Sequence, residues 1–331
     1  MRALGGSLMA AVAVVVTSLP MRADYIVKEV GSFHVGGRTI VHTPRAPLFK
    51  VNPNGEFAVE QMYVQYVKLA RPKAKVPILL WHGGGLTGAS WETKPDGKPG
   101  WQQFFLTAGY DVYISDAVER GRASWARYPD IFKSEPIFMT KKEAWELFRI
   151  GPSYEIGGPR IAFEGQQFPI EAFDQFAKQS VPRWVTNDKA TQNAYNVLVE
   201  KICPCIVVTH SQSGLFGFNA ALAAPDKIKA LVVLEPSGAP DAAKVDVNKV
   251  KDVPHLIVWG DFHDKVAVWR EISIAPRKYH NALVAAGGRA DVLDLPLMGV
   301  TGNTHMMMMD LNSDQIAKLV HDWIAKQGLV D

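Results

Sequence analysis

The sequence predicts an α/β fold in which a mostly parallel central sheet is covered by helices on both faces. Two leading stretches alternate apolar and polar residues, which is typical of half-exposed antiparallel strands. The later runs are almost continuously apolar, which favours strands buried on both faces of a parallel sheet. These runs are VPILLWHG (76–83), YDVYISD (110–116), CPCIVVTH (203–210), IKALVVLEP (228–236) and VPHLIVWGD (253–261). Helical stretches separate most of them, which indicates a mixed sheet with helices on both sides.

The individual elements follow in chain order. The leading strands are expected at 25–37 and 60–70, joined by a connection rich in Pro, Asn and Gly, and a last strand is expected at 290–296. The expected helices cover 100–109, 188–202, 214–228, 267–287 and 313–328. With 331 residues, 47% of them apolar, the chain is long enough for one such domain with a substantial core.

Residues 121–185 do not fit this alternation, because no strong apolar strand occurs among them. The segment is rich in proline and aromatic residues. Its aromatic residues include Trp125, Tyr128, Phe132, Phe138, Trp145, Phe148, Tyr154, Phe163, Phe168, Phe173, Phe176 and Trp184. A loop of this length is usually a functional lid or has structure of its own. We interpret it as a cap inserted into a core of residues 24–120 and 186–331; alternatively, the aromatic side chains form a small core of their own.

The first 23 residues differ in kind from the rest. Arg2 is followed by an apolar stretch to about Leu19, and then by Pro20 and a potential cleavage position after Ala23. This layout is typical of a secretory signal peptide, and the apolar part is short for a membrane-spanning helix. We therefore expect a periplasmic or secreted protein without stable membrane insertion. The alternatives are an uncleaved anchor and a chain that begins at Met21.

Charge and cysteine content exclude several classes of partner and cofactor. The net charge of +3 is small for this length and gives no reason to expect nucleic acid or an anionic membrane. The two cysteines, Cys203 and Cys205, cannot form a zinc site by themselves, and their spacing is not CxxC. A disulfide closing so short a loop across Pro204 would be strained, so we expect two unpaired, small apolar strand residues.

The stretch IVVTHSQSGL (206–215) carries two serines at the end of an apolar strand. A nucleophilic serine needs a base, a group that orients the base, and donors for the oxyanion. In a strand–turn–helix elbow, the residues two positions before and after the nucleophile must be small. Ser211 meets this requirement with Thr209 and Ser213, whereas Ser213 would have the bulky Leu215. The sterics favour Ser211; the alternative is that either serine merely caps a helix.

The stretch WHGGGLTG (81–88) follows directly on an expected core strand. Consecutive glycines allow backbone N–H groups to approach a ligand closely. In elbow-containing hydrolytic enzymes such a turn supplies one oxyanion donor, and the residue after the nucleophile supplies the other. The candidates here are Gly84, Gly85 and Gln212. Without the elbow downstream, the stretch would read equally well as an ordinary glycine-rich turn.

The base and the acid must come from loops later in the chain. His305 lies between the last expected strand and the final helix, where a triad base belongs, and His263 is the rival. Glu235 ends one strand, and Asp261 and Asp264 follow the next. Both loops should lie at the carboxyl edge of the sheet, where ligands bind. The residues alone leave the choice between Glu235 and Asp264 open.

Four motifs resemble those of a known family: HGGGLTGASWETKPDGKPGW (82–101), THSQSG (209–214), LEPSG (234–238) and GNTHMMMMD (302–310). Together they resemble a small group of bacterial α/β-hydrolases whose type member is a secreted esterase, esterase 713. The resemblance covers nearly all of the chain after the signal peptide. It implies Ser211 as nucleophile, Glu235 as acid and His305 as base, with Asp264 as the alternative acid. Where the type member has adjacent cysteines, this chain has Gly84 followed by a second glycine.

The expected function is therefore that of a serine esterase of the α/β-hydrolase superfamily. It would hydrolyse a small-molecule carboxylic ester through a Ser-His-Glu triad and an acyl-enzyme, with no metal or organic cofactor implied. The cap and residues 306–309, four methionines, would line an apolar pocket, unless these methionines only pack in the core. The same triad also suits an amidase, a lactonase or an acyltransferase, and a non-catalytic binding protein is a further alternative. A homodimer is compatible with the sequence.

Overall fold

The computed structural model describes residues 25–42, 54–125, 128–129 and 131–331, and the expected signal peptide at 1–23 lies outside them. The strands of the central sheet are β1 (Val27–His42), β2 (Gly55–Leu69), β3 (Ile78–Trp81), β4 (Val112–Asp116), β7 (Cys205–His210), β8 (Ile228–Leu234), β9 (His255–Trp259) and β10 (Ala290–Asp294). The helices are α1 (Ala89–Glu92), α2 (Trp101–Thr107), α3 (Lys141–Leu147), α4 (Phe173–Ala177), α5 (Asp188–Ile202), α6 (Ser213–Ala223), α7 (Ala267–Ile272), α8 (Ile274–Ala285) and α9 (Ser313–Lys326). Short elements complete the set: β5 (Ser153–Tyr154), β6 (Arg160–Ile161), η1 (Ile170–Ala172), η2 (Val247–Val250) and η3 (Pro296–Met298).

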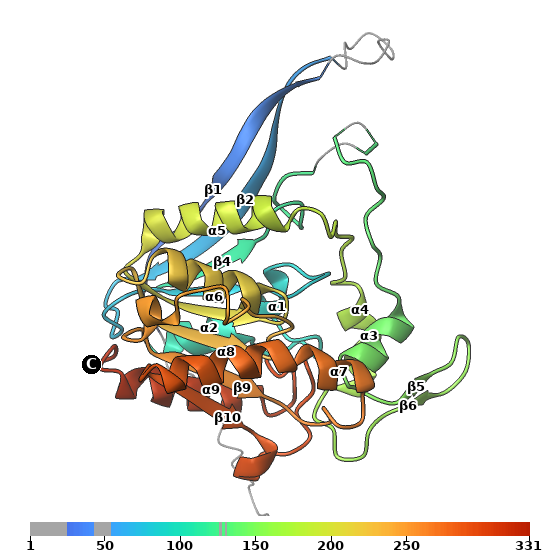
Figure 1. The fold of residues 1–331 in the computed structure, drawn as a ribbon. Helices are drawn as coiled ribbons and strands as arrows, with labels where there is room; N and C mark the ends of the chain where they lie inside the picture. Colours follow the sequence, from blue (N-terminus) through green and yellow to red (C-terminus); the bar gives the residue numbers. More distant parts are fainter. Residues whose placement is uncertain (1–24, 43–53, 126–127, 130) are drawn as a thin grey trace, which may run out of the picture.

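The strands form a mixed sheet in the order β1-β2-β4-β3-β7-β8-β9-β10. The pairs β1–β2 and β2–β4 are antiparallel, and the pairs from β4 to β10 are parallel. This confirms the fold class that the sequence predicts. Both leading strands are longer than expected, and Figure 1 shows them projecting together as an arm beyond the body of the molecule.

Helices cover both faces of the sheet because the central strands present apolar side chains to each side in turn. In β3, Ile78 and Leu80 belong to the core under α2 and α9, whereas Leu79 and Trp81 belong to the core under α5, α6 and α8. All four side chains are completely buried. Such burial on both faces explains why these runs lack the polar positions of β1 and β2.

Most helices lie where the sequence predicts them, with one difference near the C-terminus. The expected helix at 267–287 is divided into α7 and α8 at Ser273. Pro276 lies in the first turn of α8, where the absence of a backbone N–H is tolerated. One continuous helix would place this proline in its interior, so the chain begins a new helix instead.

The expectation of two unpaired cysteines is wrong. Cys203 ends α5, Cys205 begins β7, and the structure joins them in a disulfide. The turn through Pro204 brings their Cα atoms to 4.4 Å, within the range that a disulfide requires. The short loop across Pro204, from which we expected unpaired cysteines, does not prevent the disulfide.

Between β4 and α5 the chain forms α3, β5, β6, η1 and α4, which lie to one side of the sheet in Figure 1. Trp145, Phe173 and Phe176 are buried there, and Trp145 meets Phe173 edge to face at 4.9 Å. Trp125 and Phe138, by contrast, are 57% and 66% exposed. The buried aromatic side chains of the segment therefore belong to the same hydrophobic core as one face of the sheet, and other aromatic side chains lie on its surface.

Candidate active site

Ser211 lies on the sharp turn between β7 and α6. Its φ of 55° is in the left-handed region, which costs a non-glycine residue about 1–2 kcal/mol. The turn is held by the Ser211 N–H, which donates to the Leu234 carbonyl at 2.9 Å, and by the Gly214 N–H, which donates to the Ser211 carbonyl at 3.0 Å. The geometry is that of a strained strand–turn–helix elbow with Ser211 at its apex.

The other serine of the elbow is held by the backbone. The Ser213 hydroxyl accepts from the His210 N–H at 2.9 Å, and the carbonyls of Trp81 and His210 lie within 2.9 Å to receive its proton. The next residue, Gly214, packs so closely that a Cβ would lie 2.9 Å from side chains of β8 and the turn after it. The Ser213 hydroxyl therefore stabilises the elbow through hydrogen bonds to the backbone, and Ser211 occupies the apex.

The glycine turn after β3 lies directly against this elbow. A Cβ on Gly83 would lie 3.1 Å from the Cβ of Ser211, and a Cβ on Gly84 would lie 3.1 Å from Oε1 of Gln212. Such close approach favours residues without a side chain. The fold thus brings Gly83 to Ser211 and the expected oxyanion residue Gly84 to Gln212, whereas Gly85 faces Met139 and Val181.

His305 lies in the loop between η3 and α9 and is almost completely buried. Its Nδ1 is 3.2 Å from Oε2 of Glu235, and since a carboxylate only accepts, Nδ1 carries the proton and Nε2 is the basic nitrogen. The ring packs against Trp269, His210 and Phe148 at centroid distances of 4.3, 4.5 and 5.3 Å. Burial lowers the pKa of His305 to about 4, against the opposing effect of Glu235, so the ring is neutral at pH 7.

The Glu235 carboxylate is fully buried and accepts four hydrogen bonds from the described residues. Oε2 accepts from His305 and from Nη2 of Arg149 (2.7 Å), and Oε1 accepts from the Gly260 N–H and from Nε2 of His263 (3.2 Å). Burial alone would raise the pKa of Glu235, but Arg149 and His263 outweigh it and hold the pKa well below its usual value. The carboxylate is therefore ionised, and its φ of 51° adds a second strained position to the site.

The rival histidine contacts the same carboxylate from another side. His263 packs edge-on against Trp259 and Trp269, with centroid distances of 5.1 and 5.7 Å. His305 packs on the residue that directly precedes the apex serine. The geometry therefore favours His305 as the base, with His263 as a second donor to Glu235.

The two aspartates that follow β9 point elsewhere. The Asp264 side chain is 73% exposed and lies 3.4 Å from Nζ of Lys265. Asp261 accepts from the backbone N–H groups of Gly302 (2.9 Å) and Phe262 (2.7 Å), so it supports the loop that leads to the histidine. The fold therefore brings Glu235, and not Asp264, to His305.

Arg149 is a site residue that the sequence reasoning missed. It follows α3, has a φ of 58°, and its side chain is completely buried. Besides Glu235, it donates through Nε to the Asp261 carbonyl at 2.7 Å and lies over the Trp269 ring at 4.8 Å. Its partner carboxylate is 86 residues away in the sequence. An arginine within an aromatic stretch gives no local sign of such a contact.

Asp310 is a second residue that was missed, and it holds the histidine loop. Its carboxylate accepts from the Thr304 N–H (2.8 Å), the Thr304 hydroxyl (2.7 Å) and the Asn303 amide (3.0 Å). Burial raises the pKa of Asp310 to about 7, although these hydrogen bonds act against it. The residues that Asp310 holds immediately precede His305. The sequence feature that could have indicated this role is the aspartate at the end of the motif GNTHMMMMD.

Two groups of neighbouring residues lie close to the site. The His210 ring packs on His305, and its Nε2–H donates to the His305 carbonyl at 2.8 Å. Of the two interpretations of Met306–Met309, the structure supports core packing, because all four side chains are buried in the core under α2 and α9. The neighbouring Phe148, in contrast, does reach the His305 ring.

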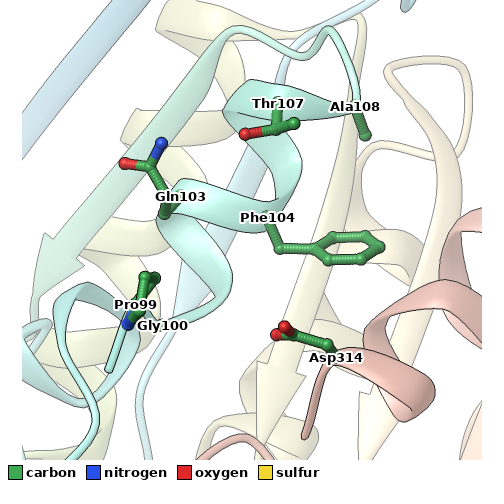
Figure 2. A pocket seen from close by; sticks show the side chains of 7 residues that line it. All are labelled: Pro99, Gly100, Gln103, Phe104, Thr107, Ala108 and Asp314. Carbon is green, nitrogen blue, oxygen red and sulfur yellow. The ribbon is translucent and has the colours of Figure 1, made fainter. Parts of the chain in front are cut away.

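Three further features of the described chain concern sites other than this one. The cavity in Figure 2, of about 290 Å³, lies between α2 and the start of α9 and is lined by none of the predicted site residues. Within the described ranges, no cluster of three or more His, Cys, Asp or Glu side chains is arranged to hold a metal ion. No helix in that part of the chain has the length and apolar character needed to cross a membrane.

Two similar proteins show which family the chain belongs to, although no family model matches it. A probable secreted lipase, phiG, from a fungal species (strain ATCC 74256) is 29% identical, and the match covers 89% of this chain and 94% of the lipase. A solved structure described as a novel bacterial esterase is 34% identical, with a TM-score of 0.82, and the match covers 92% of this chain and 97% of the esterase. The chain therefore belongs to the esterase family of α/β-hydrolases, enzymes that hydrolyse carboxylic esters.

Proposed function

We propose that the chain is a serine esterase in which Ser211, His305 and Glu235 form the catalytic triad. The observation that carries this proposal is the contact between Nδ1 of His305 and Oε2 of Glu235. The Nδ1–H is engaged by an ionised Glu235, so Nε2 is left as an unprotonated base. The ring packs on His210, directly before a serine at the apex of a strained turn. Nucleophile, base and orienting acid are thus supplied by three loops at one edge of the sheet.

The first half of the reaction transfers the acyl group to the enzyme. The Ser211 oxygen forms a bond to the ester carbonyl carbon while its proton passes to Nε2 of His305. The backbone N–H groups of Gln212 and Gly84 would stabilise the oxyanion, with Gly85 completing the glycine turn. When the bond to the alcohol breaks, the alcohol oxygen takes the proton from His305 and leaves, so the acyl group remains on Ser211.

The second half releases the acid. Water loses a proton to Nε2 of His305 and attacks the acyl carbon, and the Ser211 oxygen then leaves with that proton. Glu235 stabilises the imidazolium that forms in each half without itself being protonated. Arg149 supports this role because it keeps the Glu235 carboxylate ionised.

We also propose that residues 121–185 form a cap over this site and that the chain is secreted. The cap is supported by Phe148, whose ring lies 5.3 Å from His305, and by Val181, whose N–H donates to the Gly85 carbonyl at 2.9 Å. Secretion is supported by the apolar leader at 1–23 and by the description of the fungal relative as secreted.

The test is hydrolysis of 4-nitrophenyl butyrate by two serine variants. Ser211→Ala is expected to lower kcat on the order of 10³-fold or more, with an unchanged circular dichroism spectrum. Ser213→Ala removes the hydroxyl that fastens the elbow, so it should cost stability and retain most of the activity. Full activity of Ser211→Ala, or loss of activity in Ser213→Ala alone, would overturn the assignment.

A further inference from the structure

Arg183, from the segment proposed as the cap, extends its guanidinium to the glycine turn. A Cβ on Gly84 would lie 3.5 Å from Cζ and 3.6 Å from Nε of Arg183. The arginine is held in place through its backbone, which exchanges two hydrogen bonds with Ile137 at 2.7 and 3.0 Å. Two residues earlier, the Val181 N–H donates to the Gly85 carbonyl. The backbone of Arg183 is therefore fixed, and its guanidinium lies beside the glycine turn that would hold the oxyanion.

A second guanidinium, that of Arg120, contacts the side chain of Gln212. Arg120 is 3% exposed, and its Nη2 donates to Oε1 of Gln212 at 3.2 Å. Its Nε and Nη1 are buried without a hydrogen-bond partner in the described part of the chain. A buried cation with unused donors is costly unless a negative charge compensates it in some state of the protein.

The described residues supply little of this compensation. Asp188 is the carboxylate whose charge reaches Arg120, but it is exposed, and its Oδ1 accepts from the Gln212 amide at 3.3 Å. Arg183 and Arg120 also repel one another, and this repulsion, after burial, is a cause of a lowered Arg120 pKa of about 10. The side of the site next to Gly84 and Gln212 therefore carries an excess of positive charge.

We infer that this side of the site recognises an anionic group of the substrate, so that the preferred ester carries a carboxylate a few bonds from the scissile carbonyl. Arg183, the more accessible guanidinium, would pair directly with that carboxylate, whereas Arg120 adds positive potential from behind and orients Gln212. This inference rests on the proposed function, because it assumes that the ester binds over Gly84 and Gln212 for attack by Ser211.

Matched pairs of substrates test the inference. In the acyl arm, mono-4-nitrophenyl succinate is compared with 4-nitrophenyl butyrate, which has a methyl group in place of the carboxylate. In the alcohol arm, the butyrate ester of 4-hydroxybenzoate is compared with phenyl butyrate. The wild-type enzyme should prefer the anionic ester in one arm by about tenfold in kcat/KM, as expected for a charge-assisted hydrogen bond. The arm that shows the preference identifies the half of the ester that carries the charge.

Arg183→Gln should reduce this ratio to about one, chiefly through a higher KM for the anionic ester. The matched control is Arg38→Gln, which removes an exposed cation paired with Glu60 on the β1–β2 arm and should leave the ratio intact. A wild-type ratio of one or less in both arms, or an unchanged ratio in Arg183→Gln, overturns the inference while leaving the esterase proposal standing. Hydrolysis of none of the four esters would instead contradict the proposed function itself, and the inference with it.

Discussion

Nδ1 of His305 lies 3.2 Å from Oε2 of Glu235, and both side chains are buried. The two residues are 70 positions apart and come from loops that follow β8 and η3. The contact fixes the tautomer of the imidazole, because only a protonated Nδ1 can donate to the carboxylate. The proposed triad depends on this pair. Each member has a rival, His263 for His305 and Asp264 for Glu235, so the assignment can be tested with variants.

His305→Ala should lower kcat/KM for 4-nitrophenyl butyrate on the order of 10³-fold or more, because it removes the base. His263→Ala removes one of four donors to Glu235 and should cost less than about tenfold, since the other donors remain. Initial rates at pH 7.5 compare the two variants. A larger loss in the His263 variant would transfer the role of base to that residue.

Glu235→Gln should lower kcat by about 10²- to 10⁴-fold, because an amide no longer stabilises the imidazolium and leaves Arg149 without its charge partner. Asp264→Asn should stay within about twofold of the wild type, since that side chain is largely exposed. Thermal unfolding of both variants separates loss of catalysis from loss of folded protein. A loss of kcat confined to Asp264→Asn would restore the aspartate as the acid.

Arg149 should set the acidic limb of the pH–rate profile. Its charge lowers the pKa of Glu235 and also acts to lower that of His305, whose pKa is about 4 chiefly through burial. Because His305 must be neutral to accept a proton, its protonation should lower kcat/KM of the folded wild-type enzyme only as the pH drops toward 4. Arg149→Met should move this limb to higher pH, and Arg149→Lys should move it part of the way back. A limb at the same pH in all three proteins would mean that Arg149 acts only through packing.

Acid should destabilise the protein steeply below pH 6.5. His82, His255 and His305 have pKa values of about 4, and the pKa of His210 is also held well below its usual value. Burial is the main cause in each case, so unfolding lets all four take up a proton at pH 5–6. Asp310, with a raised pKa of about 7, loses one proton on unfolding in the same range. Four gained and one lost leave a net uptake of about three protons, so the free energy of unfolding should fall by roughly 4 kcal/mol per pH unit as the pH drops. Urea titrations at pH 6 and pH 5 measure the slope, and equal stability at both values would contradict it.

The sequence predicts the sheet well because strands buried on both faces require almost continuously apolar runs. Runs such as ILLW in β3 and CIVVTH in β7 contain hardly any polar position, and each is directly preceded by a proline. The elbow could be located for the same reason, since sterics at Thr209 and Leu215 act between close neighbours in the chain.

Contacts between distant segments could not be predicted in this way. Arg149 contacts Glu235, which is 86 residues away in the sequence. The choice between Glu235 and Asp264 depends on which of their loops lies against His305. The disulfide of Cys203 and Cys205 was missed although its partners are close, because its formation depends on the turn angle between α5 and β7. Local patterns carry no information about either kind of geometry.

Labelling with a fluorophosphonate, followed by peptide mass spectrometry, tests directly whether Ser211 is the activated nucleophile. An activated serine attacks the phosphorus and keeps the adduct, whereas an ordinary serine hydroxyl does not react. We expect one adduct per chain, located on Ser211, absent from Ser211→Ala and slowed on the order of 10²-fold or more in His305→Ala. An adduct on Ser213, or a wild-type protein that is folded and remains unlabelled, would contradict the account.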